Sequence, residues 1–258
     1  MKTPLFTAAI LSISLLTNPV LAADSERVDA APVEESSATM VKSAVDPWEK
    51  FNRSMFSFNM GADKYFLKPL AKTYVRLTPG FFRQGVDNAL SNILEVPSAL
   101  NGLLQGNFRG AAHDTGRLLI NSTLGLAGLI DVAQHMGLKL TDHEDFGQTL
   151  AVWGVGSGPY VVLPLLGPSN LRDASATPVD WYTDPKTYID HIPTKNTTRA
   201  LSVVNTRANL LPLEKGISGD KYVFFREAYL QRRNFLINNG KVEDSFGEDD
   251  EGAGDSGL

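Results

Sequence analysis

The residues best suited to metal ligation or nucleophilic chemistry are few in this chain of 258 residues, which has four histidines and no cysteine. His113, His135, His143 and His191 never show the four-residue spacing that places two imidazoles on one face of a helix. Without cysteine thiolates, a structural zinc site is not expected either. We therefore predict neither a metal site nor a cofactor.

Two short stretches resemble catalytic patterns without matching them. Residues 154–158 read GVGSG, but Pro159 stands where G-x-S-x-G needs its second glycine, and no strand is expected before the loop. Residues 143–145 read His-Glu-Asp, but adjacent residues point in different directions on a helix. We interpret the first as a turn and the second as a solvated first helical turn, so neither indicates an enzyme.

The elements that surround these residues are expected to be helices, interrupted often by 22 glycines and 14 prolines. Asp46 as N-cap and Pro47 at the first helical position predict the start of one helix, in which Phe51, Met55 and Phe58 form an apolar stripe. Further helices are expected over residues 69–76, 81–96, 97–106, 108–125, 143–153, 197–211 and 221–237.

Other segments are expected to be shorter or irregular. Residues 160–166 read as extended, Ser169 as the N-cap of a short helix, and residues 178–198 as irregular and rich in proline. Asp220 is expected to begin the last helix, and residues 238–240 to end it. The predicted fold class is all-α, with one short extended segment.

Apolar residues are more abundant on these helices than a soluble bundle needs. Residues 118–138 are the most apolar part of the body, but polar residues such as Asn121 and Asp131 interrupt them, which favours a two-helix hairpin over a spanning helix. Wide apolar arcs also mark residues 47–60, 81–95 and 107–124. Such a surplus is typical of exported proteins that bind lipid, lie at a membrane interface or pack on a partner.

The two ends of the chain differ in composition from its body. Residues 1–22 resemble a signal peptide, with Lys2 before an apolar stretch that is too short to span a bilayer and a cleavage site after Ala22. An uncleaved N-terminal anchor is the alternative. Residues 23–45 and 241–258 are expected to be disordered acidic segments around a domain of residues 46–240. That domain is only mildly basic, so no nucleic-acid partner is expected.

Several motifs in the body, in order, resemble one family. Residues 46–53 read DPWEKFNR and are followed by Met55 and Phe58-Asn59. Residues 104–106 read LQG, and residues 121–133 read NSTLGLAGLIDVA. The series continues at the following positions: FGQTL at 146–150, GVGSGPYVVLP at 154–164, LRD at 171–173 and REAY at 226–229. Together they resemble the MlaA/VacJ family, which maintains phospholipid asymmetry in the Gram-negative outer membrane.

The resemblance implies a single ring-like domain of amphipathic helices that encloses a channel in the outer membrane and is reached from the periplasm. A phospholipid misplaced in the outer leaflet would pass through that channel to the periplasmic carrier MlaC. Trimeric porins would be its membrane partners, and no covalent chemistry is implied.

Residue roles are also implied by the resemblance. The first helix would control the lipid channel through the residues Phe51, Asn52, Ser57, Phe58 and Asn59. The gating hairpin would contain the residues Asn121, Leu124, Gly125, Gly128, Leu129 and Ile130, and its two glycines would let it flex. Packing of the ring is the alternative role for each of these side chains.

The departure from the family is the missing lipidated cysteine, because Asp24 follows Ala23 where many members carry a cysteine. A single acyl chain gives only marginal membrane binding, whereas an apolar belt of about 400 Å² would contribute about 10 kcal/mol at ~25 cal/mol/Å². We therefore expect an unlipidated protein that still resides in the outer membrane, on its periplasmic side. The alternative function is a soluble periplasmic lipid-binding shuttle or scaffold.

Overall fold

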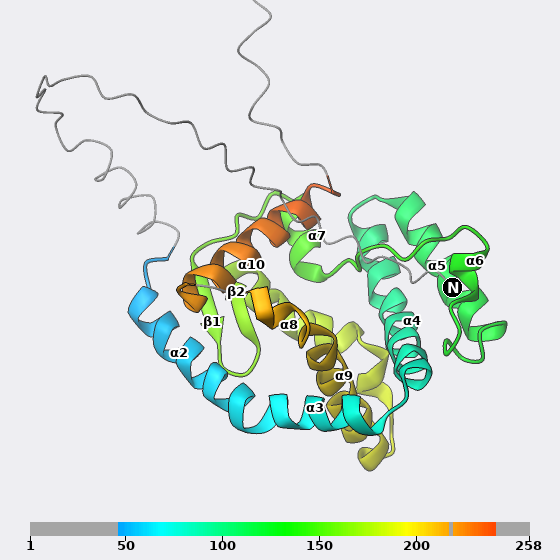
Figure 1. The fold of residues 1–258 in the computed structure, drawn as a ribbon. Coiled ribbons are helices and arrows are strands. Elements are labelled where there is room, and N and C mark those ends of the chain that lie inside the picture. Colours follow the sequence, from blue (N-terminus) through cyan, green and yellow to red (C-terminus); the bar gives the residue numbers. More distant parts are fainter. Residues whose placement is uncertain (1–45, 217–218, 241–258) are drawn as a thin grey trace, which may run out of the picture. The chain divides into compact units, whose positions relative to one another are not determined.

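A computed structural model describes residues 46–216 and 219–240, which are mostly helical with one small antiparallel sheet (Figure 1). The predicted fold class is confirmed. The expected signal peptide, acidic lead and acidic tail lie outside the described residues.

The chain begins with a long helical arm. It consists of α2 (Glu49–Ala62), a π-helical turn η1 (Asp63–Leu67) and α3 (Lys68–Leu77), so the expected second helix continues the first. The prediction that Asp46 caps α2 is wrong, because Trp48 holds the N-cap position and no side chain caps it. Asp46 is instead buried, and its carboxylate accepts hydrogen bonds from Asn52, Tyr222 and Arg226.

The next two helices pack side by side along most of their length. They are α4 (Gly80–Leu104) and α5 (Phe108–Thr123), and the break between α3 and α4 falls at residues 78–80 as expected. The predicted break at Pro97 is wrong, because α4 runs through it. A proline removes one helical hydrogen bond, but here the helix is held by its buried contact with α5.

The remaining elements differ from the sequence expectations mainly at their starts. They are α6 (Val132–His135), α7 (Phe146–Val152), β1 (Tyr160–Leu163), β2 (Gly167–Asn170), α8 (Leu171–Thr183), η2 (Pro185–Tyr188), α9 (Ile192–Leu210), η3 (Leu213–Gly216) and α10 (Lys221–Ile237). Asp145 and Asn170 cap α7 and α8, so helices predicted to start at His143 and to be capped by Ser169 start later. Residues 178–198, expected to be irregular, are largely helical.

The end of the described chain agrees with the prediction. The Asp220 carboxylate accepts a hydrogen bond from the backbone N–H of Tyr222, which caps α10. Asn239 and Gly240 take positive φ values of 51° and 79° directly after the helix, as expected for a C-terminal stop.

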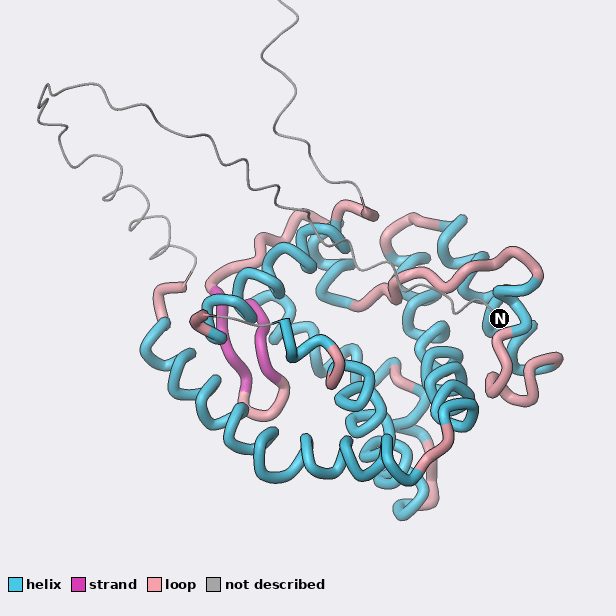
Figure 2. Tube along the Cα trace, in the orientation of Figure 1, coloured by secondary structure: helices cyan, strands magenta, loops and turns pink. Residues whose placement is uncertain are grey.

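Contacts between these elements form a closed circuit. From α2 the circuit passes through η1 and α3 to α9, α4, α7 and α10, and β2 and β1 return it to α2. In the antiparallel sheet Tyr160 lies opposite Asn170, and Figure 2 shows the two strands, in magenta, between α2 and α10. This circuit is the ring-like arrangement that the resemblance implied.

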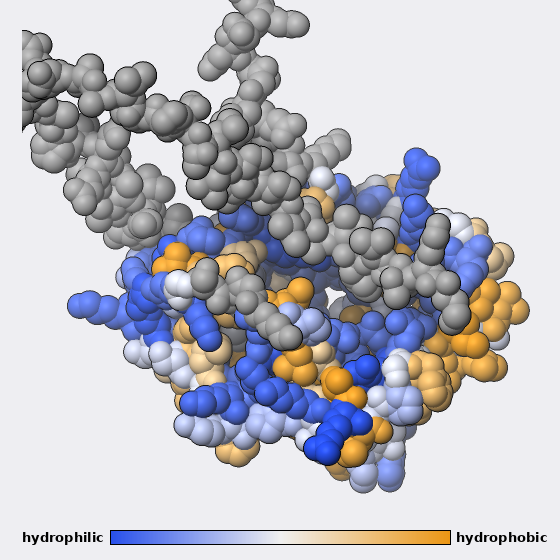
Figure 3. Space-filling model, in the orientation of Figure 1, coloured by the Kyte–Doolittle hydropathy of each residue, from blue (hydrophilic) through white to orange (hydrophobic). Residues whose placement is uncertain are grey.

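The polarity of the domain is partly inverted. Its buried apolar cluster is small, with Tyr160, Val162 and Tyr222 at its centre. On α4 the side chains of Asn92, Glu95 and Asn101 are buried, whereas Phe81 at the start of the same helix is 80% exposed. Figure 3 shows apolar side chains gathered at the edge of the domain where α5 and α6 lie. None of the described helices combines the length and the hydropathy needed to cross a bilayer.

Candidate functional site

A cavity of about 330 Å³ with a partly polar wall lies between α4, α9, α10 and the segment before α7. Four leucines form part of its wall, and hydroxyl, amide, carboxylate, imidazole and guanidinium groups form the rest. The lining residues are Asp87, Leu90, Ser91, Leu94, Leu140, Thr141, Asp142, His143, Ser202, Asn205, Thr206, Arg232 and Leu236. The cavity can therefore accept a ligand that is part polar and part apolar.

A buried charge network lies behind the α4 wall of this cavity. Arg117 on α5 donates from Nε to Glu95 Oε1 at 2.7 Å and from Nη2 to Asp131 at 3.2 Å. Its Nη1 also donates to the carbonyl of Leu138 at 2.5 Å, which fixes the chain that leads to the cavity. Burial raises the pKa of Glu95 to about 7, against the lowering effect of Arg117.

The expected solvated turn at residues 143–145 is wrong, because all three residues are at least partly buried and make contacts. His143 Nε2 lies 3.0 Å from the hydroxyl of Ser91, and burial lowers the pKa of His143. The backbone N–H of Glu144 donates to Ser98, and its carboxylate accepts from Gln105. The segment connects α4 to α7 through these hydrogen bonds. Local sequence could not predict them, because Ser91, Ser98 and Gln105 are about 40 to 50 positions away.

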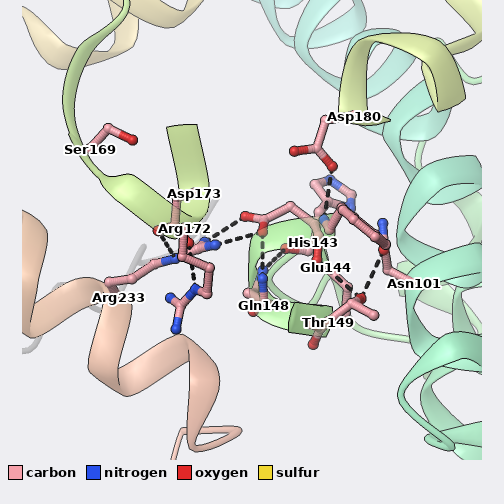
Figure 4. A network of polar contacts seen from close by, with 12 residues as sticks. Asn101, His143, Glu144, Gln148, Thr149, Ser169, Arg172, Asp173, Asp180 and Arg233 are labelled. Carbon is pink, nitrogen blue, oxygen red and sulfur yellow. Dashed lines mark hydrogen bonds and ion pairs between the residues drawn. The ribbon is translucent and has the colours of Figure 1, made fainter. Parts of the chain in front are cut away.

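A second network joins α7, α8 and α10 beside a smaller cavity of about 200 Å³ (Figure 4). Arg233 on α10 binds both oxygens of Asp145 at 2.5 and 2.6 Å, and its Nε lies 2.6 Å from Asp173. Although burial opposes it, Tyr229 and Arg233 hold the pKa of Asp173 below its usual range. Asp145 thus caps α7 and also fixes α10 to it.

The predicted gating hairpin is a tight turn between α5 and α6. Asn121 is buried; its amide donates to Asp131 at 3.0 Å, and its oxygen accepts from the backbone N–H of Ala133 at 2.9 Å. The apolar side chains of the turn point the other way and are exposed. They are Leu124, Leu126, Leu129 and Ile130.

Both glycines of this turn lie where a larger residue has no room. A Cβ on Gly125 would lie 2.2 Å from the carbonyl oxygen of Ile130, and Gly128 has a φ of +89° with a Cβ position 2.8 Å from Asn92. Asn88 on α4 donates to the carbonyl of Leu129 at 3.0 Å. The glycines thus allow close packing of the turn on α4, and the flexing that we expected of them stays a prediction.

The predicted first-helix residues divide into two groups. Asn52 and Asn59 hold the sheet: Asn52 accepts from the backbone N–H of Val162 and donates to the carbonyl of Tyr160, and Asn59 donates to the carbonyl of Leu163. Phe51 and Phe58 are more than half exposed, at 52% and 55%. The remaining member, Ser57, donates to a carbonyl one turn earlier on the same helix.

Comparison with known proteins assigns the chain to a family. The family model described as MlaA lipoprotein matches residues 44–236. The chain belongs to the MlaA family. A relative in Escherichia coli K12, the intermembrane phospholipid transport system lipoprotein MlaA, is 36% identical over 214 residues, 81% of this chain and 84% of the relative.

Further relatives and a solved structure are also similar to this chain. The intermembrane phospholipid transport system lipoprotein MlaA of Haemophilus influenzae is 30% identical over 256 residues, covering 95% of each chain. An uncharacterized protein of Rickettsia bellii is 36% identical over 245 residues, 92% of this chain and 94% of its own. A solved structure described as the structural basis for maintenance of bacterial outer membrane lipid asymmetry is 36% identical, with a TM-score of 0.66 over 75% of this chain and 99% of that one.

The MlaA-family motifs and the cavity are distinct parts of the domain. None of the predicted first-helix or hairpin residues lines the cavity, whereas Asp87, Ser91 and Arg232, which sequence reasoning missed, do. No local signal marks these three residues. The polar stripe that the sequence does show on α4, from Asn92 through Glu95 and on to Ser98 and Asn101, belongs to the buried contacts of that helix and not to the cavity lining. Such a stripe inside an otherwise apolar helix indicates a buried polar face.

Across residues 46–216 and 219–240, no group of three or more histidine and acidic side chains is placed to hold a metal ion.

Proposed function

We propose that this protein is an outer-membrane component of intermembrane phospholipid transport, with the cavity between α4, α9 and α10 as the passage for the lipid head group. The observation that carries the proposal is the inverted polarity of the domain: charged and amide side chains are buried, while large apolar ones face outward. The names of the E. coli and H. influenzae relatives support the transport role.

The exposed apolar side chains would lie in the lipid. Phe81 and Phe82, 80% and 54% exposed, begin α4, and the turn that carries Leu126 and Leu129 packs against the same helix. Apolar side chains grouped on one helix and its neighbouring turn would bury their surface in the acyl region of a leaflet without spanning it.

The turn at residues 121–133 would then control access to the passage. It packs on the first half of α4, and residues of that half also line the cavity. A movement of the turn would therefore displace side chains of the cavity wall. Asn52 and Asn59 would act more remotely, by holding the sheet that closes the circuit. A periplasmic carrier such as MlaC would receive the lipid, and trimeric porins would accompany the protein in the membrane; the family resemblance supports both partners.

Membrane fractionation and lipid analysis test the proposal. The full chain is produced in a Gram-negative host, and the outer-membrane, inner-membrane and detergent-free soluble fractions are compared. We expect the protein with the outer membrane, and phospholipid bound to it after purification in detergent. The double variant Phe81→Glu/Leu129→Glu should shift it toward the soluble fraction.

A matched control separates lost apolar contact from added charge. Asn196→Asp/Gln231→Glu introduces the same two charges at exposed polar positions away from α4, α5 and α6, and should leave the distribution unchanged. Recovery of the unaltered protein in the soluble fraction with bound lipid would favour the periplasmic shuttle instead. Recovery there without lipid would contradict both functions.

A further inference from the structure

Asp87 contributes a negative charge to the cavity wall, and its carboxylate is held in place by neighbouring amides. Asp87 lines the cavity from α4, and its Oδ1 accepts hydrogen bonds from the amides of Asn205 and Asn209, each at 2.9 Å. The amide of Asn205 is oriented in turn by Tyr74, whose hydroxyl donates to its oxygen at 3.3 Å. Asn205 is 2% exposed, so the arrangement is built into the fold and is not a chance surface contact.

Asp87 has no cationic partner in the described parts of the chain. No lysine, arginine or histidine nitrogen among the side chains described in residues 46–214 and 219–240 lies within 4.0 Å of its carboxylate, although Arg83 is one helical turn away. Amide donors satisfy hydrogen bonds without neutralising charge. The carboxylate therefore gives the wall a negative charge that no ion pair with a described side chain neutralises.

The other charges of the wall cancel. Arg232 is the one arginine or lysine among the residues that line the cavity, and its Nη2 lies 2.6 Å from Asp142, which also lines it. Burial lowers the pKa of His143, which disfavours a positive charge on its imidazole. The cavity thus offers a carboxylate that accepts amide hydrogen bonds but has no ion-pair partner among the described side chains and, from another helix, a guanidinium whose partner is a solvent-accessible carboxylate.

We infer that the cavity selects lipid head groups by charge, and favours a zwitterionic phosphoethanolamine head over an anionic phosphoglycerol head. The ammonium group of the former would bind Asp87, and its phosphate would bind Arg232 in place of Asp142. The phosphoglycerol head carries the same phosphate but no cation, so Asp87 repels it. This inference rests on the proposed transport function and adds to it the class of head group.

A competition experiment tests the inference on the full chain. Purified protein in nonionic detergent is incubated with equal amounts of phosphatidylethanolamine and phosphatidylglycerol that carry the same acyl chains, repurified, and analysed for bound lipid by mass spectrometry. We expect about threefold more of the zwitterionic lipid, the size expected for one solvent-accessible ion pair.

Two variants assign the preference to Asp87. Asp87→Asn keeps an oxygen that can accept from Asn205 and Asn209, so the fold is retained, and the bound ratio should return to that of the mixture. Asp190→Asn removes the same charge from an exposed position outside the cavity, and should keep the threefold preference.

The possible outcomes distinguish the transport function from the head-group preference. Failure to bind either lipid would overturn the proposed transport function. Binding of both lipids in the proportion of the mixture would overturn the head-group inference and leave transport standing. A preference that Asp87→Asn retains would overturn it as well, because the charge of the wall would then have another source.

Discussion

The contact between α2 and the sheet and the turn at residues 121–133 both depend on a buried asparagine, but their surroundings differ. Asn52 lies beside the apolar cluster of Tyr160, Val162 and Tyr222, and its amide also donates to Asp46, which pairs with the buried Arg226. Asn121 lies beside Asp131, which pairs with the buried Arg117, and the leucines of its turn point outward. Both asparagines thus border a buried ion pair, but only the first contact is also backed by an apolar cluster, whereas the second depends on glycine geometry.

This difference implies different sensitivity to substitution. Removing one hydrogen-bonding partner from a packed apolar region leaves neutral buried groups unsatisfied, at a cost of about 1–3 kcal/mol, while the packing remains. Removing one partner from a buried charge network leaves an unpaired charge, which costs more. Single substitutions should therefore affect the turn more strongly than the contact between α2 and the sheet.

The largest effect should come from Arg117→Met. It leaves Glu95, 1% exposed, and Asp131 without their cation, and should lower the free energy of unfolding by about 3–5 kcal/mol. Denaturant unfolding of the purified protein measures this loss. Arg232→Met, which breaks an exposed ion pair, is the control and should cost less than about 1 kcal/mol. Equal losses would remove the contrast between the two regions.

Gly128→Ala should have the next largest effect. Its φ of +89° is strained for alanine, and the added Cβ would lie 2.8 Å from Asn92, so we expect a loss of about 2–3 kcal/mol by the same measurement. Gly61→Ala on α2 is the matched substitution, because nothing lies within 4 Å of its Cβ position. It should stabilise the protein by about 0.5–1 kcal/mol, and a loss there would contradict our view of α2.

Glu95→Gln should change how stability depends on pH. Burial raises the pKa of Glu95 from 4.5 to about 7 in the folded protein. Between these values the unfolded chain loses the proton and the folded protein keeps it, so this group's contribution to stability falls as pH rises. Between pH 4.5 and pH 7, the free energy of unfolding of the unaltered protein should fall by about 2 kcal/mol more than that of the variant. An equal change in both proteins would contradict a raised pKa of Glu95.

Asn52→Ala should have the smallest effect of the four. The variant loses the hydrogen bonds to Val162, Tyr160 and Asp46 but keeps the apolar cluster, so we expect a loss of about 1–2 kcal/mol. Thermal and denaturant unfolding measure it against the Arg117→Met variant. A loss greater than that of Arg117→Met would reverse the comparison on which the predictions rest.

Prediction from the sequence worked best for features encoded by neighbouring residues. The break at residues 78–80, the glycine-rich loop at 154–158 and the cap and stop of the last helix all follow from local backbone preferences. The family was also recognisable, because its motifs are continuous stretches that follow one another along residues 46–229. The same reasoning failed at Asp46 and Asp145, two acidic residues that precede helices and have distant partners.

Those partners explain what local sequence could not decide. Asp46 binds Arg226, 180 positions away, and Asp145 binds Arg233, 88 positions away. An acidic residue before a helix can cap that helix and bind a distant arginine, as Asp145 does, or bind the arginine without capping the helix, as Asp46 does, and which of these occurs depends on the helices that the fold brings together. For the same reason the cavity, to which Asp87 and Arg232 contribute from different helices, is absent from any single motif.

The sequence by itself therefore determined the helical class, most of the helix ends, the family and the surplus of apolar side chains, since each depends on short-range preferences or on composition. Only the tertiary structure decided which face of each helix is buried. On α4 the burial of Asn92 and Glu95 against α5, with Phe81 and Phe82 left outside, reverses the usual arrangement. Such a reversal is stable only where the buried polar groups find partners on a neighbouring helix, and Arg117 on α5 and Ser122 at the end of that helix provide them.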